Sequence, residues 1–384
     1  MSNIYKLYNQ VKNYEWGSNF LIPQFLGIEN SSETPFAELW MGTHHGAPSK
    51  IEQGGEFIEL KEVSGEIPFL FKLLAIEKPL SIQAHPNLVQ AKEGFKREED
   101  AGIDINAPER NYKDDNHKPE IICALSHFTL MAGFRETAET NEYLKILVSI
   151  LPSIKGLITP LINALEKGSL SDFFRALFSI SKQDRELIFK NIFENESIIT
   201  EKSSDVITPL LWQLMKKFAG FYPNDIAILS PLYLNVLNLE PGQAIYVPSG
   251  ILHAYINGFG VELMTASDNV LRGGLTPKHV DQNELIKILN FVPFKPKVID
   301  SNEESSFYYY TPCNEFLLVK INGNGENVHP IKGPAVCLVT EGELLVDDLL
   351  FKKGESFFIP RTEETLFLKG NCTLFAAVSG EWRI

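Results

Sequence analysis

The fold of this 384-residue chain is decided by one segment, Gly242-Gln-Ala-Ile-Tyr-Val-Pro248-Ser-Gly250-Ile-Leu-His253-Ala-Tyr-Ile-Asn257. The apolar run that ends at Val247 predicts a strand, the Pro-Ser-Gly step predicts a tight turn, and a second strand begins at His253. A lone histidine is more often a buried, hydrogen-bonded core residue. A rigid turn that delivers one imidazole into the interior of a β-structure favours a metal ligand instead.

The spacing of Gly242, Pro248, Gly250, His253 and Asn257 resembles the second motif of the cupin superfamily, position for position. Cupins are small jelly-roll barrels. The resemblance implies a barrel that encloses a metal site, with His253 as one of the ligands.

A second polar cluster lies in Ser81-Ile-Gln83-Ala-His85, after the apolar run from Phe69 to Ile76. Successive side chains alternate along a strand, so Ser81, Gln83 and His85 share one face. Contact with water would explain three polar residues on one face, and so would contact with a metal. The segment therefore supplies candidate ligands for the same site as His253.

A third segment, Asp114-Asp-Asn-His117-Lys118-Pro-Glu120, leads into an apolar strand. Lys118 and Glu120 have the same parity, so a lysine and a carboxylate would project into one space. A salt bridge between the two is the simpler interpretation. A carboxylate ligand beside a reactive lysine is the alternative.

Taken together, these segments resemble type I phosphomannose isomerases. The resemblance is carried by Ser81-Ile-Gln-Ala-His85-Pro, by Asn116-His-Lys-Pro-Glu120, and by the region from His253 to Lys278 with Ser267-Asp-Asn-Val-Leu-Arg272-Gly-Gly. The segments Asn13-Tyr-Glu-Trp16-Gly-Ser18 and Glu38-Leu-Trp-Met-Gly-Thr43-His44 are similar to the same family. The likeness extends from Tyr5 to the C-terminus and is weakest through the middle of the chain.

The resemblance implies a zinc-dependent interconversion of mannose 6-phosphate and fructose 6-phosphate through an enediol. It implies one Zn²⁺ per chain, held by Gln83, His85, Glu120 and His253, and it makes Arg272 a catalytic residue. Two imidazoles, one carboxylate and one amide oxygen suit a borderline ion. Because this set carries a single negative charge, a divalent metal keeps a net positive charge for an anionic substrate.

The remaining roles follow from the enediol chemistry, which needs charge stabilisation and a base near C1 and C2. We expect Lys118 to assist Arg272 and to shuttle the proton, with Asp268 and His117 as alternative bases. Contacts with the substrate are expected from Lys72, Ser81, Tyr255, Glu262 and Asp268. Because a lysine inside an apolar strand is costly unless it is paired or functional, we expect Lys72 to contact the phosphate.

Composition limits the possible partners and the compartment. The net charge of −14 argues against nucleic acid or an anionic membrane as a partner, and an acidic chain that binds a sugar phosphate needs a local cluster of Lys and Arg. Four cysteines without a CxxC pair predict reduced thiols. With no secretion signal and no apolar run of about 18 residues, we expect a cytoplasmic protein, either a monomer or a weak homo-oligomer.

The distribution of apolar residues predicts an inserted helical domain. Residues 137–222 carry apolar side chains at i, i+3, i+4 spacing, as at Tyr143 and Leu147. The flanking residues 1–136 and 223–300 carry the strand patterns and the candidate ligands. We expect these two flanking parts to form one metal-binding cupin barrel.

Residues 301–384 are expected to form a second, cupin-like barrel. The segment from Gly354 to Thr365 aligns without a gap on Gly242 to His253, but Thr362 replaces the turn glycine and Thr365 replaces the histidine. This internal repeat predicts a barrel without a metal. The expected fold class is therefore mainly β, with two cupin jelly-roll barrels and an inserted α-helical domain.

Two other functions stay open on the sequence alone. An oxygenase-like, metal-dependent cupin enzyme would use more histidine ligands, and Gln83 argues against it. A sensor that binds a sugar phosphate without turnover would not need Lys118, Arg272 and Glu262 together.

Overall fold

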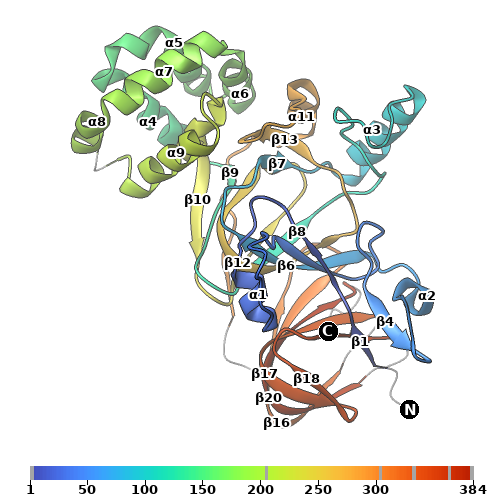
Figure 1. Cartoon of the computed structure of the whole chain (residues 1–384). Helices are drawn as coiled ribbons and strands as arrows, with labels where there is room; N and C mark the ends of the chain where they lie inside the picture. Colours follow the sequence, from blue (N-terminus) through green and yellow to red (C-terminus); the bar gives the residue numbers. More distant parts are fainter. Residues whose placement is uncertain (1–3, 204–205, 302–304, 331–333, 362–364, 381–384) are drawn as a thin grey trace.

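The structure is a computed structural model, and it describes the chain except for residues 1–3, 204–205, 302–304, 331–333, 362–364 and 381–384. Within the described residues, the strands form an eleven-stranded sheet, a seven-stranded sheet and a two-stranded ribbon. Figure 1 shows the larger sheet in the middle of the molecule, a group of helices above it and the smaller sheet below it.

The larger sheet carries every segment that the sequence connects with the metal. Its strands are β2 (Gln10–Lys12), β3 (Glu38–Met41), β6 (Phe69–Ile76), β7 (Ile82–Ala84), β8 (Glu120–Ala124), β9 (Phe128–Phe134), β10 (Leu234–Leu239), β11 (Gln243–Val247), β12 (His253–Thr265), β13 (Leu271–Gly274) and β14 (Ile299–Asp300). The long strand β12 pairs with β7 and β9 near its start and with β6 and β8 over its second half. It therefore joins the two parts of the sheet.

The smaller sheet contains the C-terminal strands and one strand from the N-terminus. Its members are β1 (Tyr5–Leu7), β15 (Ser306–Tyr309), β16 (Leu317–Pro330), β17 (Ala335–Val346), β18 (Leu349–Lys352), β19 (Ser356–Ile359) and β20 (Thr365–Val378). Strand β1 pairs with β19, so the start of the chain joins the C-terminal sheet. The ribbon is β4 (Lys50–Gln53) with β5 (Glu56–Glu59). The turn residue Thr362 lies outside the described residues.

The strand pairing of the described residues does not confirm the two jelly-roll barrels expected from the sequence. The larger sheet runs from β14 to β2 and the smaller one from β1 to β15, and neither path returns to its start. Helices also take a larger share of the chain than a mainly β fold implies. Large antiparallel sheets accompanied by an extended group of helices describe the fold.

The helical segment predicted by apolar spacing is present. It consists of α4 (Thr137–Ile150), the 3₁₀ helix Pro152–Ile154, α5 (Lys155–Glu166), α6 (Leu170–Ser179), α7 (Lys182–Glu194), α8 (Glu196–Ser203) and α9 (Pro209–Phe221). The apolar stripe residues Tyr143 and Leu147 are buried. They belong to a core that also contains Ile82 of β7 and Leu271 of β13, so the helices pack beside the strands that carry candidate site residues.

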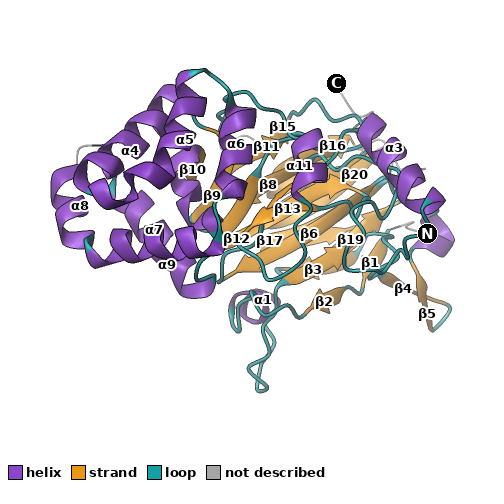
Figure 2. Ribbon diagram, turned by 90° about the horizontal axis from the view of Figure 1, so that it is seen from above, coloured by secondary structure: helices purple, strands orange, loops and turns teal. Residues whose placement is uncertain are grey.

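The remaining described helices lie outside this segment. They are α1 (Leu21–Leu26), α2 (Lys61–Ser64), α3 (Leu88–Asp100), the 3₁₀ helix Ile226–Leu229, α10 (Ser230–Tyr233) and α11 (Gln282–Ile288). Figure 2 shows α3 and α11 over the sheet when the molecule is seen from above. An ion pair between Arg97 and Glu284 joins these two helices.

No single described helix is long and apolar enough to cross a membrane. One consecutive pair, Thr137–Ile150 with Pro152–Glu166, reaches the required length and composition only when counted together, and it is bent by 115° at its break.

The two sheets pack against each other through a shared apolar layer, and this layer determines the direction of the polar side chains on β6 and β12. Phe71 and Leu73 of β6 and Val261 of β12 pack with Leu318 and Phe358 of the smaller sheet. Because side chains alternate along a strand, the residues between them, such as Lys72, point to the opposite face. The polar side chains of β6 and β12 are therefore directed away from the C-terminal sheet.

Candidate metal centre

Three side chains converge at the start of β12. His85, Glu120 and His253 are buried, and their candidate ligand atoms all lie within 4.8 Å of one another. His253 Nε2 lies 2.8 Å from Glu120 Oε1, and His85 Nε2 lies 3.4 Å from Glu120 Oε2. The structure thus brings together three of the four residues expected to bind a metal.

Strand pairing explains how His253 and Gln83 meet, whereas Glu120 pairs with Met264 near the far end of β12 and reaches His253 with its side chain. His253 is the first residue of β12 and lies opposite Gln83 of β7. Glu120 is the first residue of β8, which pairs with the second half of β12. His85 directly follows β7, which is shorter than the strand expected from Ser81 to His85.

Backbone carbonyls orient both imidazoles. His85 Nδ1 lies 2.7 Å from the carbonyl oxygen of Asn269, and His253 Nδ1 lies 2.9 Å from that of Ile251. A carbonyl oxygen only accepts, so each Nδ1 carries the proton and donates it. Each Nε2 is then left with a lone pair directed at Glu120, which is the arrangement of histidines that bind metals.

The amide of Gln83 lies against the same group. Its Nε2 is 3.4 Å from His253 Nε2. Rotation of the amide by 180° exchanges its nitrogen and oxygen and directs Oε1 at the histidine instead. Gln83 therefore lies where a fourth donor is expected.

The charges at this centre fit a divalent cation. Burial alone would raise the pKa of Glu120, but Lys118, His253 and His85 outweigh it and hold that pKa well below its usual range. Burial, reinforced by Lys118, lowers the pKa of His85 to about 4. One ionised carboxylate and neutral imidazoles are the forms that bind zinc.

A protein cation already lies against these donors. Lys118 Nζ donates to Glu120 Oε2 over 3.0 Å and lies 3.3 Å from His85 Nε2. Positive charge is thus favoured at this point of the structure. The donors fit a divalent metal both in chemistry and in charge.

Lys72, which the sequence assigns to the phosphate, lies on β6 beside β12 and is paired with carboxylates. Its Nζ is 3.2 Å from Glu262 Oε2 and 3.9 Å from Glu38 Oε2. Burial would lower the pKa of Lys72, but Glu38 and Glu262 outweigh it and raise that pKa. Lys72 therefore keeps its charge, and that charge is offset by its neighbours.

Two further residues expected to contact the substrate lie at different depths. Tyr255 is buried and donates its hydroxyl to Glu120 Oε1 over 3.0 Å, so it supports a candidate ligand. Burial raises the pKa of this phenol, which stays protonated. Ser81 directly precedes β7 and is partly exposed.

Arg272 belongs to a group of cations. It lies on β13, opposite Gln83, and burial lowers the pKa of its guanidinium. Burial also lowers the pKa of Lys278, and repulsion from Arg272 and Lys113 adds to this effect. Within the described residues neither Arg272 nor Lys278 forms an ion pair, so this positive charge is not neutralised by the protein.

The carboxylate of Asp268 lies close to the imidazoles of two histidines. Its carboxylate oxygens are 3.4 Å from His44 Nε2 and 3.7 Å from His45 Nε2. His44 Nδ1 accepts the amide proton of Gly46 over 3.2 Å. Because Nδ1 accepts, the ring proton of His44 lies on Nε2 and points at Asp268. His44, His45 and Asp268 form a second group whose ligand atoms lie within 4.8 Å of one another, but His45 is exposed and Asp268 is partly exposed, unlike the three buried residues of the first group.

Sequence reasoning missed the partners that come from distant segments. His117 Nε2 lies 2.8 Å from Glu315 Oε1, a residue of the loop between β15 and β16. Glu38 and Lys278 were quoted only as parts of motifs. The need of an acidic chain for a local cationic cluster was the one signal that pointed toward Lys278 and Lys113.

Comparisons with known proteins agree with this geometry. Residues 4–137 match the family model for the type I phosphomannose isomerase catalytic domain. The chain is 34% identical to the mannose-6-phosphate isomerase of Escherichia coli strain K12, over 95% of this chain and 97% of that protein. It is 31% identical to a probable mannose-6-phosphate isomerase of Caenorhabditis elegans, over 94% and 91% of the two chains.

Solved structures give the same result. The chain is similar to a crystal structure of mannose 6-phosphate isomerase from Salmonella typhimurium bound to fructose 6-phosphate and zinc, with 32% identity and a TM-score of 0.88. That comparison covers 98% of this chain and all of the other. A zinc-bound mannose 6-phosphate isomerase gives the same TM-score and identity over the same shares of both chains.

Proposed function

The chain belongs to the type I phosphomannose isomerase family, and from this we propose that its buried His85–Glu120–His253 cluster is the zinc site of a mannose-6-phosphate isomerase. The resemblance found in the sequence is confirmed. The enzyme interconverts mannose 6-phosphate and fructose 6-phosphate. The observation that carries the function is the convergence of two oriented imidazoles and an ionised carboxylate beside a group of unneutralised cations.

We assign the metal to His85, Glu120, His253 and Gln83. The first three supply their donors in the protonation states that zinc needs, and Gln83 supplies an amide oxygen after rotation. Bound zinc supplies a Lewis acid that polarises a carbonyl oxygen. Because Glu120 is the only anionic donor of the set, the loaded site keeps positive charge for an anionic substrate.

The phosphate is better placed at Arg272 and Lys278 than at Lys72. Lys72 is offset by Glu262 and Glu38, whereas Arg272 and Lys278 have no carboxylate partner among the described residues. A dianion relieves the mutual repulsion of these cations, to which Lys113 contributes. Lys72 then holds Glu262 and Glu38 in place at the substrate side of β6.

Proton transfer between C1 and C2 needs a group that can both take and give a proton. Lys118 remains our candidate for the shuttle, since it lies 3.0 Å from Glu120, and Arg272 stabilises charge on the enediolate oxygens. Burial raises the pKa of Glu262, although Lys72 opposes this effect. Glu262 is therefore a further proton-exchanging group, in addition to orienting the substrate hydroxyls. Lys72 is not a base, because its neighbours keep it protonated.

Tyr255, Ser81 and Asp268 stay in the proposed substrate site, but their surroundings refine the role of each. Tyr255 acts through Glu120, to which it donates a hydrogen bond, and Ser81 lies at the partly exposed edge of β7. Asp268 orients the substrate from a position beside His44, and His117, an alternative base, is paired with Glu315.

We infer that the two sheets are two cupin-type jelly rolls and that residues 137–222 are a domain inserted into the first. The turn before His253 and the fit of Gly354 to Thr365 onto it support this division. The part formed by residues 301–384 is proposed to hold no metal. The first jelly roll would contain residues 1–136 and 223–300.

We propose a cytoplasmic location and a monomer or weak homo-oligomer that acts on a small sugar phosphate, with no nucleic acid or membrane as partner. The four free cysteines and the net charge of −14 support this proposal. An oxygenase-like function or a sensor function is not favoured, since the relatives reported above are isomerases.

The decisive experiment follows proton exchange at C2 of mannose 6-phosphate in deuterium oxide, with zinc-loaded and chelator-treated protein. We expect exchange and fructose 6-phosphate formation only with the loaded protein. Binding of the sugar phosphate without exchange would point to a sensor, and oxygen consumption would point to an oxygenase.

A further inference from the structure

Two loops deliver the reactive groups, and one buried residue lies between them. Residues 113–116 lead to Lys118 and Glu120, and residues 267–269 lead to Arg272 on β13. Asn269 lies in the second loop and is fully buried. Nothing in the proposed chemistry uses this side chain, although a buried amide is costly unless all its hydrogen bonds are made.

Both the nitrogen and the oxygen of the Asn269 side-chain amide form hydrogen bonds, and all their partners lie on the first loop. Its Nδ2 donates to the carbonyl oxygens of Asp114 and Asn116, each over 2.8 Å, and to Asp114 Oδ1 over 3.1 Å. Its Oδ1 accepts the amide protons of Lys113 over 2.7 Å and of Asp114 over 3.2 Å. Asn269 thus fixes the backbone at Lys113, Asp114 and Asn116.

Asp114 returns the interaction. Its Oδ2 accepts the amide proton of Asp268 over 2.7 Å, and its Oδ1 accepts the hydroxyl of Ser267 over 2.8 Å. Each loop therefore holds the other by a side chain that binds the opposite backbone. We call this reciprocal arrangement of Asn269 and Asp114 the loop clasp.

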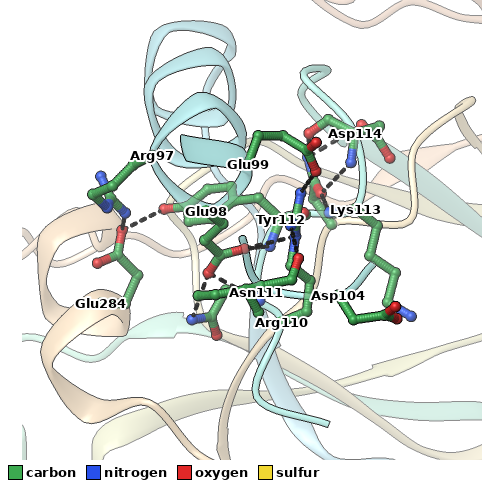
Figure 3. Close-up of polar contacts among 12 residues, drawn as sticks. Arg97, Glu98, Glu99, Asp104, Arg110, Asn111, Tyr112, Lys113, Asp114 and Glu284 are labelled. Atoms are coloured by element: carbon green, nitrogen blue, oxygen red, sulfur yellow. Dashed lines mark hydrogen bonds and ion pairs between the residues drawn. The ribbon is translucent and has the colours of Figure 1, made fainter. Parts of the chain in front are cut away.

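The first loop is also anchored on its other side. Figure 3 shows Asp114 and Lys113 at the end of a polar network around α3 and α11. In it Glu98 Oε2 accepts the amide proton of Tyr112 over 2.9 Å, and the hydroxyl of Tyr112 donates to Glu284 over 2.8 Å. The clasp thus connects the second loop to a part of the molecule that is already held in place.

Asn269 reaches the metal centre through its backbone. Its carbonyl oxygen accepts the proton of His85 Nδ1 over 2.7 Å, the bond that leaves His85 Nε2 with a free lone pair. The position of this carbonyl depends on the loop that the Asn269 side chain holds. The partner of the other ligand, the carbonyl of Ile251, belongs to an apolar residue that has no side-chain hydrogen bond to set its position.

We propose that Asn269 is a positioning residue that, through the loop clasp, sets His85 toward the metal and holds the backbone of Lys113, a cation of the group around Arg272. The inference rests on the proposed function, which assigns the metal to a site that includes His85 and the phosphate to the cations near Arg272. Residues that hydrogen-bond a ligand histidine typically change metal affinity by about 10- to 100-fold when they are lost. The clasp predicts such an effect without any change in the four donors.

The test uses the full-length, zinc-loaded protein and the variants Asn269→Ala and Asn235→Ala. Asn235 is the matched control, since it is a buried amide whose Nδ2 donates to backbone carbonyls, including that of Phe294 over 2.9 Å, but not to the carbonyls of Asn269 and Ile251 that orient the ligand histidines. The rate at which zinc passes to an excess of chelator is measured, together with the melting temperature and KM. We expect zinc release to be about 10- to 100-fold faster in Asn269→Ala, with a raised KM for mannose 6-phosphate. Asn235→Ala is expected to lower only the melting temperature.

Zinc release at the wild-type rate from folded Asn269→Ala would overturn the proposal. If Asn269→Ala does not fold, Asp114→Asn carries the test, because it weakens the same clasp without opening a cavity. In that variant faster zinc release supports the clasp, and unchanged release overturns it. A wild-type protein that neither binds zinc nor isomerises would instead remove the proposed function, so the two failures are distinguishable.

Discussion

Lys72 and Glu262 are direct partners in the antiparallel register of β6 and β12, and the Nζ of one lies 3.2 Å from Oε2 of the other. Both residues are buried, and 190 positions separate them in the sequence. Glu38 approaches the same ammonium from β3 at 3.9 Å. The lysine that the sequence assigns to the phosphate is thus committed to the protein's own carboxylates.

Replacing Lys72 by methionine should destabilise the fold. Lys72→Met keeps an unbranched side chain but leaves Glu262 buried without its partner, which costs about 3–5 kcal/mol for buried pairs of this kind. Urea denaturation of the zinc-loaded protein measures this change in the free energy of unfolding. The double variant Lys72→Met/Glu262→Gln should recover part of the loss, because it removes the unpaired charge.

The matched surface control is Lys96→Met, which breaks an exposed pair with Asp100. Such pairs contribute at most about 1 kcal/mol. If Lys72→Met were no less stable than Lys96→Met, the buried pair would have no structural role. A large rise in KM at unchanged stability would restore the original assignment of Lys72 to the phosphate.

Removal of His253 should abolish stoichiometric zinc. His253→Ala takes away one imidazole donor and leaves Glu120 and His85 too few to hold the ion tightly. Zinc content is measured after dialysis against a weak chelator, with circular dichroism to verify folding. His127→Ala, at an exposed histidine, is the control and should keep one zinc per chain. One tightly held zinc in folded His253→Ala would refute the assignment.

The zinc-free protein should lose stability between about pH 6.5 and pH 4. The pKa of His85 is lowered to about 4 in the folded chain, against about 6.5 for an unfolded histidine. Between these values the unfolded chain binds more protons, so the free energy of unfolding falls as the pH falls. The loss from this residue is on the order of 3 kcal/mol across the window.

His85→Gln is the control for that titration, because it keeps a polar side chain and removes the ionising group. Urea denaturation at several pH values should show a flatter dependence for the variant than for the wild type. Equal slopes in both zinc-free proteins would mean that His85 is not buried as a neutral residue.

Local sequence patterns predicted the metal donors because those patterns act over a few residues. The Pro248–Gly250 turn presents His253, and strand parity puts Gln83 and His85 on one side, although β7 covers only Ile82 to Ala84. Lys118 and Glu120 meet as their parity predicts, with Lys118 just outside β8.

The contacts that the sequence did not predict join segments far apart in the chain. The pairs Lys72–Glu262 and His117–Glu315 and the clasp of Asn269 depend on sheet register and loop packing, which no spacing rule encodes. The two jelly-roll barrels were expected by analogy with a motif, and the strand pairing does not confirm them. A motif determines a turn, but it does not determine how a whole sheet closes.

Lys278 should contribute to binding rather than to the chemical step. Lys278→Ala removes one cation from the group around Arg272, and the phosphate is fully charged in the ground state and in the transition state. The loss should therefore raise KM for mannose 6-phosphate and leave kcat close to the wild-type value. Steady-state kinetics at two salt concentrations measures it, since a phosphate contact weakens as salt rises. A lowered kcat with unchanged KM would move Lys278 into the catalytic group.

Replacing Arg272 distinguishes two roles that its position allows, namely stabilisation of the enediolate and binding of the phosphate. Arg272 lies on β13, and its register partner on β7 is the candidate ligand Gln83. It also belongs to the cationic group, in which its charge repels that of Lys278. If its guanidinium also stabilises charge that develops only in the enediolate, Arg272→Ala should lower kcat by about 100-fold or more, a larger factor than the rise in KM. If it only holds the phosphate, Arg272→Ala should resemble Lys278→Ala and act on KM.

We expect the first outcome for Arg272, because Lys278 and Lys113 remain to bind the phosphate when the guanidinium is lost. Arg272→Lys keeps the charge but not the planar pair of donors, so it should restore little of kcat. Proton exchange at C2 in deuterium oxide, measured on the same variants, reports the enediol step directly. Normal kcat and normal exchange in Arg272→Ala, with only KM raised, would assign Arg272 to the phosphate and leave Lys118 and the metal to stabilise the enediolate.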